Sequence, residues 1–75
     1  MKLSDLKVGD KARIISVRAI GMTRKRLMDM GVIVGEVLKV EKIAPLGDPI
    51  DILIRNYHLS LRKREAAEIE VEVIW

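Results

Sequence analysis

Residues 44–50 read Ala44-Pro45-Leu46-Gly47-Asp48-Pro49-Ile50 and contain both prolines of the chain. Each proline fixes its own φ angle and lacks a backbone N–H, so neither a helix nor a central strand continues through this stretch. Glycine and aspartate supply turn chemistry between the two prolines. Because strand-like sequence flanks the stretch at residues 36–43 and 50–55, we predict a stiff loop that joins two strands. Such a loop is either a plain hairpin connection or an exposed functional surface.

Alternating apolar side chains predict three strands in the second half of the chain. Isoleucine occupies every even position of residues 50–54, which is the period of a strand with one buried face. Apolar and polar residues alternate again over residues 57–62, after a short turn at residues 56–57, so the two strands form a hairpin. Residues 64–68 predict one helical turn, and residues 69–75 predict a terminal strand.

Two strands before the loop change phase along their length, which predicts bends. The apolar parity of residues 11–20 switches at Ile14 and Ile15, and residues 36–43 contain a similar switch. A β-bulge produces this pattern, and a small closed barrel requires bent strands. We therefore predict a mainly-β fold, a small five-stranded barrel with one short inserted helix, forming a single domain over residues 1–75. The core is expected to contain Ile14, Leu38, Val40, Ile52, Ile54, Leu59, Leu61, Val71 and Val73, capped by Leu27 and Met30.

The inserted helix is predicted at residues 22–30, followed by Gly31 in the left-handed conformation. Met28 falls outside the packed face of this helix, beside Arg24 and Lys25. A methionine flanked by two cations is the nearest thing to a docking patch on the helix; the alternative is that Met28 packs against a loop. The packed face itself is expected to consist of Thr23, Leu27 and Met30.

Positive charge is concentrated in the first half of the chain. Residues 1–42 contain ten Lys or Arg and five Asp or Glu, a balance of +5, while residues 43–75 contain four and six, a balance of −2. Such a surface faces phosphates, anionic lipid or an acidic protein, or it simply keeps a small protein soluble. Tyr57 and Trp75 are the only aromatic residues, too few to stack nucleic-acid bases, so we expect no nucleic-acid partner.

The composition also argues against several other classes of protein. The longest uninterrupted apolar run has three residues, so we expect no insertion into a membrane. The chain has no cysteine, which suits a reducing cytosol. His58 is the only histidine, so we expect no metal site and no cofactor. No nucleophile–base pair or glycine-rich phosphate loop is present in the sequence, so we expect no enzymatic activity.

Several short motifs follow one another along the chain: Leu3-Ser4-Asp5-Leu6, Val8-Gly9-Asp10, Arg26-Leu27, Met30-Gly31, Val34-Gly35, the loop of residues 44–49, Leu61-Arg62 and Glu65-Ala66. In this order they resemble the FeoA family over the whole chain. The most specific part is the Ala-Pro-Leu-Gly-Asp-Pro loop, together with its spacing to Leu61-Arg62. Val34 stands where the family usually has proline, and Met30 where it usually has leucine, and both replacements keep an apolar side chain.

The resemblance implies an SH3-like barrel that accompanies FeoB, a membrane permease for ferrous iron with a cytosolic G-protein domain. On this basis we expect a cytoplasmic, non-enzymatic accessory protein that is peripheral to the inner membrane through its partner, with self-association left open. Similar barrels also occur as regulatory domains of iron-dependent repressors, so a free-standing regulatory module of that type is an alternative, and an RNA-associated barrel is another. The residues expected to contact the partner are Arg24, Lys25, Met28, Pro45, Leu46, Gly47, Asp48 and Pro49.

Overall fold

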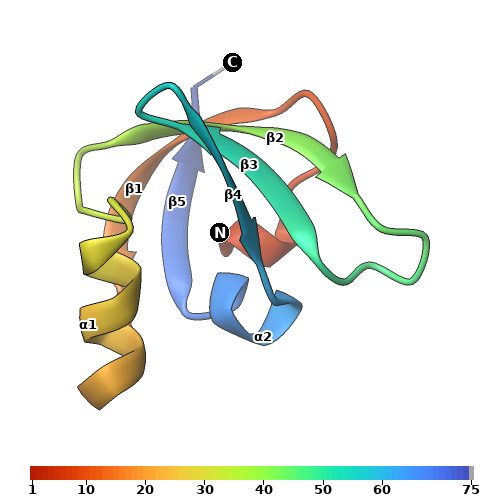
Figure 1. The fold of residues 1–75 in the computed structure, drawn as a ribbon. Coiled ribbons are helices and arrows are strands. Elements are labelled where there is room, and N and C mark those ends of the chain that lie inside the picture. Colours follow the sequence, from red (N-terminus) through yellow and green to blue (C-terminus); the bar gives the residue numbers. More distant parts are fainter. Residues whose placement is uncertain (75) are drawn as a thin grey trace.

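The computed structural model describes residues 1–74 as a curled β-sheet with three short helices (Figure 1). Trp75, at the end of the predicted terminal strand, lies outside the described residues. None of the described helices is long and apolar enough to span a membrane. The elements in chain order are the 3₁₀ helix η1 (Leu3–Asp5), β1 (Lys11–Val17), α1 (Gly21–Asp29), β2 (Val37–Ile43), β3 (Ile50–Ile54), β4 (Tyr57–Leu61), α2 (Lys63–Ala66) and β5 (Ile69–Val73).

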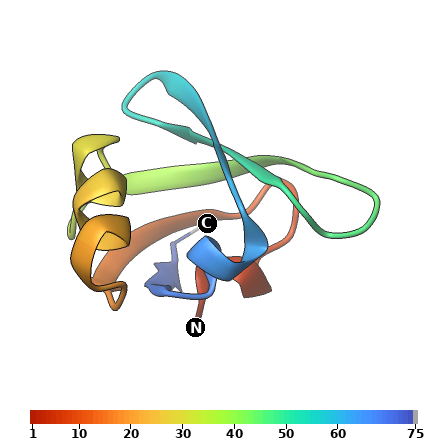
Figure 2. The ribbon, with the colours of Figure 1, turned by 60° about the horizontal axis from the view of Figure 1, so that its bottom comes forward.

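The strands form one five-stranded antiparallel sheet in the order β4-β3-β2-β1-β5. Figures 1 and 2 show the sheet curling, so that the β3–β4 hairpin lies over the layer formed by β1 and β5. Helix α2 joins β4 to β5 at one end of this barrel, and α1 stands at one side of it. The predicted mainly-β, five-stranded barrel with one inserted helix is therefore confirmed.

Both predicted bends are present as shifts in strand register. The pairing of β1 with β5 shifts between Ile14 and Ser16, and the pairing of β2 with β3 shifts between Val40 and Lys42. An extra residue on one strand bends that strand and increases its twist. The parity switches in the sequence therefore mark the places where the sheet curls.

Two predicted boundaries are wrong by a few residues. The first strand ends at Val17 rather than at residue 20, because the chain leaves the sheet there to begin α1. The turn between β3 and β4 consists of Arg55 and Asn56, whose φ angles are +51° and +67°. Two successive positive φ angles are typical of a two-residue hairpin turn, so Tyr57 is already the first residue of β4.

Most of the predicted core is confirmed, and the structure adds residues to it. Val73 is the clear exception, 46% exposed because it ends β5 at the rim of the barrel. Leu59 and Met30 are only partly buried, and Thr23 is exposed, so the packed face of α1 is reduced chiefly to Leu27. The additional buried residues are Leu3, Leu6, Ala12, Val17, Ala19, Val32, Ile50, Ala66 and Ile69.

Candidate functional site

Helix α1 turns one side to the barrel and the other side to solvent. Leu27 is its buried residue and belongs to the core cluster. Met22, Lys25, Arg26 and Asp29 follow the spacing i, i+3, i+4 and i+7, so they form a stripe along the side of α1 that faces away from Leu27. This side of α1 therefore carries charged side chains along its length and an exposed methionine, Met22, near its N-terminal end.

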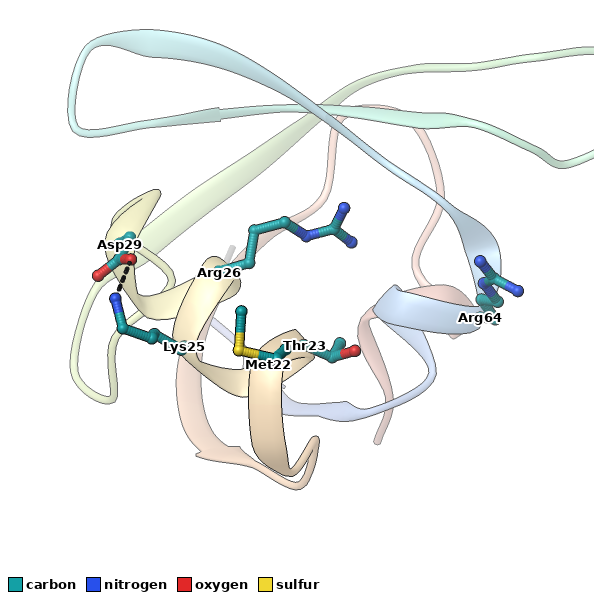
Figure 3. Close-up of a pocket in the computed structure, with 6 residues that line it drawn as sticks. All are labelled: Met22, Thr23, Lys25, Arg26, Asp29 and Arg64. Carbon is teal, nitrogen blue, oxygen red and sulfur yellow. Dashed lines mark hydrogen bonds and ion pairs between the residues drawn. The ribbon is translucent and has the colours of Figure 1, made fainter.

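An open groove of about 500 Å³ lies between this stripe and α2 (Figure 3). The side chain of Arg26 extends from α1 into the space between the two helices, and Arg64 stands on α2 at the other side. The groove therefore joins side chains that are far apart in the sequence. Its lining residues are Met22, Thr23, Lys25, Arg26, Asp29 and Arg64.

An ion pair between Arg26 and Glu65 connects α1 to α2 across the groove. Glu65 is the only buried charged residue in the described part of the chain, with 6% of its surface exposed. Its Oε1 atom accepts a hydrogen bond from the backbone N–H of Arg62, at 2.9 Å, where α2 begins. Burying a carboxylate is unfavourable unless the group is paired and hydrogen-bonded, so Glu65 depends on both contacts. Arg26 thus has a structural partner at one end of the groove.

The lining of the groove carries more positive than negative charge. Among the lining side chains Lys25, Arg26 and Arg64 are positive and Asp29 is negative, and Arg26 is also paired with Glu65, which lies outside this lining. Lys25 Nζ lies 3.2 Å from Asp29 Oδ2, so these two charges offset one another on α1. No ion pair within residues 1–74 involves Arg64. Because a guanidinium group binds carboxylate and phosphate groups through two parallel hydrogen bonds, this arrangement suits an anionic ligand.

The predicted docking patch on α1 is only partly available to a partner. Arg24 donates a hydrogen bond from its guanidinium group to the carbonyl oxygen of Val17, so it fastens α1 to β1. Lys25 is paired with Asp29. Met28 is 39% exposed and therefore offers part of its side chain to solvent beside Lys25. Of the three predicted residues, Arg24 has the clearest structural role.

The loop between β2 and β3 presents Leu46, which is 94% exposed. The backbone N–H of Gly47 donates to the carbonyl oxygen of Ala44 at 2.7 Å, which closes the turn. Asp48 Oδ1 accepts a hydrogen bond from the backbone N–H of Lys63 at 2.9 Å, so the loop is also tied to the start of α2. These contacts and the two prolines hold Leu46 on a stiff support.

The two predicted contact regions lie on opposite sides of the molecule. Figures 1 and 2 both place α1 at one side and the β2–β3 loop at the other. The structure therefore does not unite them in one patch. It instead groups α1 with Arg64 and Glu65 of α2, neither of which is among the predicted contact residues. The spacing of charges along α1 could have indicated one wall of this groove, but no pattern in the sequence indicated the other wall.

No group of three metal-binding side chains is present in residues 1–74, counting His, Cys, Asp and Glu. His58 is exposed on β4. The absence of a metal site stays a prediction, because it concerns binding in solution.

We expect ferrous iron to bind only weakly to the isolated protein. One exposed histidine and dispersed carboxylates do not supply the three or four ligands that a specific transition-metal site needs. Anaerobic calorimetric titration with Fe(II) should show no stoichiometric tight binding, and His58→Ala should give the same isotherm as the wild-type protein. A tight site that disappears in His58→Ala would contradict this expectation.

The chain matches the model of the FeoA domain over residues 1–73. A Porphyromonas gingivalis protein described as a fusion of Fe(2+) transport protein A with the Fe(2+) transporter FeoB is 46% identical over 74 residues. That match covers 99% of this chain and 9% of the fusion protein, so the chain spans only a small part of this curated relative.

Solved FeoA structures resemble the whole fold, as two examples show. The FeoA protein of Chlorobium tepidum is 47% identical with a TM-score of 0.93, and the match covers 100% of this chain and 71% of that one. The FeoA of Stenotrophomonas maltophilia, solved with zinc, is 26% identical with a TM-score of 0.84, covering 96% of this chain and 89% of that one. It is described as a prokaryotic SH3 domain protein and a candidate activating factor of ferrous iron transport, so the SH3-like character of the barrel is confirmed.

Proposed function

Because this chain belongs to the FeoA domain family, we propose that it is a non-enzymatic accessory protein of bacterial ferrous iron uptake that docks on a FeoB-type permease. It acts in the cytoplasm and reaches the membrane through this partner. The observation that carries the proposal is the Porphyromonas gingivalis relative, in which a segment 46% identical to this chain is described as fused to FeoB.

Fusion supports docking through effective concentration. Two modules on one polypeptide meet at a high local concentration, so even a weak contact between them is populated. A separate chain lacks this advantage and needs a surface that recognises the permease. Such a surface can be small, because a few side chains usually carry most of the affinity of a protein interface.

The structure offers two candidate surfaces for this contact. One is the outer side of α1, where Met28 combines an adaptable apolar side chain with the neighbouring charge of Lys25. The other is the β2–β3 loop, where Leu46 is presented with little conformational entropy left to lose on binding. Since the two surfaces lie on opposite sides of the molecule, a flat interface engages one of them.

Co-purification with the permease of the same organism tests the proposal. We expect the wild-type protein to be retained and one of the two variants, Met28→Asp or Leu46→Asp, to bind at least about tenfold more weakly, which corresponds to about 1.4 kcal/mol of binding free energy. Both side chains are exposed, so circular dichroism should show that both variants fold. If both folded variants bind fully and support ferrous iron uptake, neither surface is the interface; if the wild-type protein does not bind, the proposed function is wrong.

A further inference from the structure

The groove between α1 and α2 has features that structural stability does not require. Of its three cations, Arg26 contacts the buried Glu65, yet its side chain remains 61% exposed. The carboxylate of Glu65 can engage only some of the five N–H donors of the Arg26 guanidinium group. Arg64, on the opposite wall, makes no ion pair within residues 1–74. Two guanidinium groups therefore border one open space with donors directed to solvent.

Apolar side chains are exposed at the start of α1, and one of them, Met22, lies beside these cations. Met22 lines the groove and is 80% exposed, and Ile20, just before α1, is also largely exposed. Burial of either side chain would be favourable, since covering apolar surface contributes roughly 25 cal/mol per Å². Methionine adapts its shape to different partners because its side chain is unbranched and polarizable. The start of α1 thus adds an apolar contact to a cationic groove.

The combination selects one class of occupant. A single-stranded nucleic acid would stack its bases on aromatic side chains, and the groove lining contains none. A bilayer presents a broad surface, which cannot follow the space between two helices. A protein segment with carboxylates and an apolar side chain fits both the charges and the shape. We propose that this groove binds an acidic segment of the permease's cytosolic part, an inference that rests on the proposed function.

In this arrangement the segment lies between the two helices. Its carboxylates accept hydrogen bonds from Arg64 and from the exposed donors of Arg26, and an apolar side chain covers Met22. Glu65 keeps the guanidinium group of Arg26 in place before the segment arrives, so little side-chain ordering is needed on binding. Because the contact is between opposite charges near the surface, it weakens as salt is added.

The experiment measures affinity for the purified permease in detergent with three proteins. Arg64→Glu reverses the charge of an exposed side chain on α2 that makes no ion pair within residues 1–74. Lys7→Glu makes the same change in net charge at an exposed residue of the η1–β1 turn, which lies far from α1 in both views. We expect Arg64→Glu to weaken binding at least about tenfold and to reduce its salt dependence, and Lys7→Glu to remain within about twofold of the wild-type protein.

Each outcome decides between the two proposals. If the wild-type protein binds and Arg64→Glu binds equally well, the groove is not the site and the proposed function stands. If Lys7→Glu weakens binding as much as Arg64→Glu, net charge is responsible and the groove assignment is wrong. If the wild-type protein does not bind the permease, the proposed function fails and this inference with it. Co-sedimentation of the wild-type protein, but not Arg64→Glu, with vesicles containing about 30% phosphatidylserine would assign the groove to lipid instead.

Discussion

Replacing Ile52 with alanine is expected to leave the protein marginally folded or unfolded. Ile52 is completely buried at the centre of β3, between Val40 on β2 and Leu59 on β4. Truncating a buried isoleucine to alanine costs roughly 2–5 kcal/mol, because apolar burial is lost and a cavity remains. A domain of this size has a total stability on the order of 5–10 kcal/mol, so the loss is a large part of it. Thermal and urea unfolding, followed by circular dichroism, measure the effect.

The matched control is Ile15→Ala, which removes the same atoms from an exposed position. Ile15 is 47% exposed on β1, next to the bulge. A surface substitution of this kind changes stability by about 0.5 kcal/mol or less. We expect a drop in Tm of about 10 °C or more for Ile52→Ala and only a few degrees for Ile15→Ala. An unchanged Tm for Ile52→Ala would mean that the alternating pattern does not mark the buried face.

The strands were predictable from the sequence because side chains alternate between the two faces of a strand. In residues 50–54 this alternation is uninterrupted, and all three isoleucines on its apolar face are buried, including Ile50, which the predicted core did not contain. The bends were predictable for the same reason, since a bulge shifts the alternation by one residue. The parity switch at Ile14 and Ile15 and the register shift between Ile14 and Ser16 are two observations of one bulge.

The candidate site was much less predictable, because it depends on contacts between distant segments. Arg26 and Glu65 are 39 positions apart, and only the curling of the sheet brings α1 beside α2. The hydrogen bond from Arg24 to the carbonyl oxygen of Val17 likewise depends on where α1 packs. The loop and α1 were predicted together as contact residues, since each has the composition of an exposed surface. The composition of a segment does not show on which side of the folded protein that segment lies.

Gly31→Ala is expected to destabilise the protein by about 2–3 kcal/mol and to disturb the end of α1. Gly31 has φ +94°, a conformation that costs a residue with a Cβ atom roughly 1–2 kcal/mol. A Cβ atom at this position would lie 2.6 Å from the Tyr57 hydroxyl oxygen and 3.2 Å from Cδ of Arg55. Since the hydroxyl is at the end of a partly exposed ring, the ring moves aside, and we expect a further cost of about 1 kcal/mol.

Gly35→Ala separates the two contributions to this cost. Gly35 has φ +97°, nearly the same as Gly31, but no atom would lie within 4 Å of its new Cβ atom. The variant should therefore lose only the backbone contribution, roughly 1–2 kcal/mol. The difference between the two glycine variants in urea unfolding measures the contacts with Tyr57 on β4 and with Arg55 in the preceding turn.

Tyr57→Phe provides the decisive comparison, because it removes the atom nearest to the new methyl group. The next ring atom, Cζ, would lie 3.7 Å from the Cβ atom, which is an ordinary contact distance. The close contact that remains, with Cδ of Arg55 at 3.2 Å, is to an exposed flexible side chain that can shift. In the Tyr57→Phe background, Gly31→Ala should therefore cost about as much as Gly35→Ala, and the double-mutant cycle should give a coupling of about 1 kcal/mol. Full additivity would show that the ring of Tyr57 does not rest on Gly31.

The same variants also test the position of α1, which carries one wall of the groove. If folded Gly31→Ala is retained more weakly on the permease than folded Gly35→Ala, the displaced end of α1 accounts for the difference.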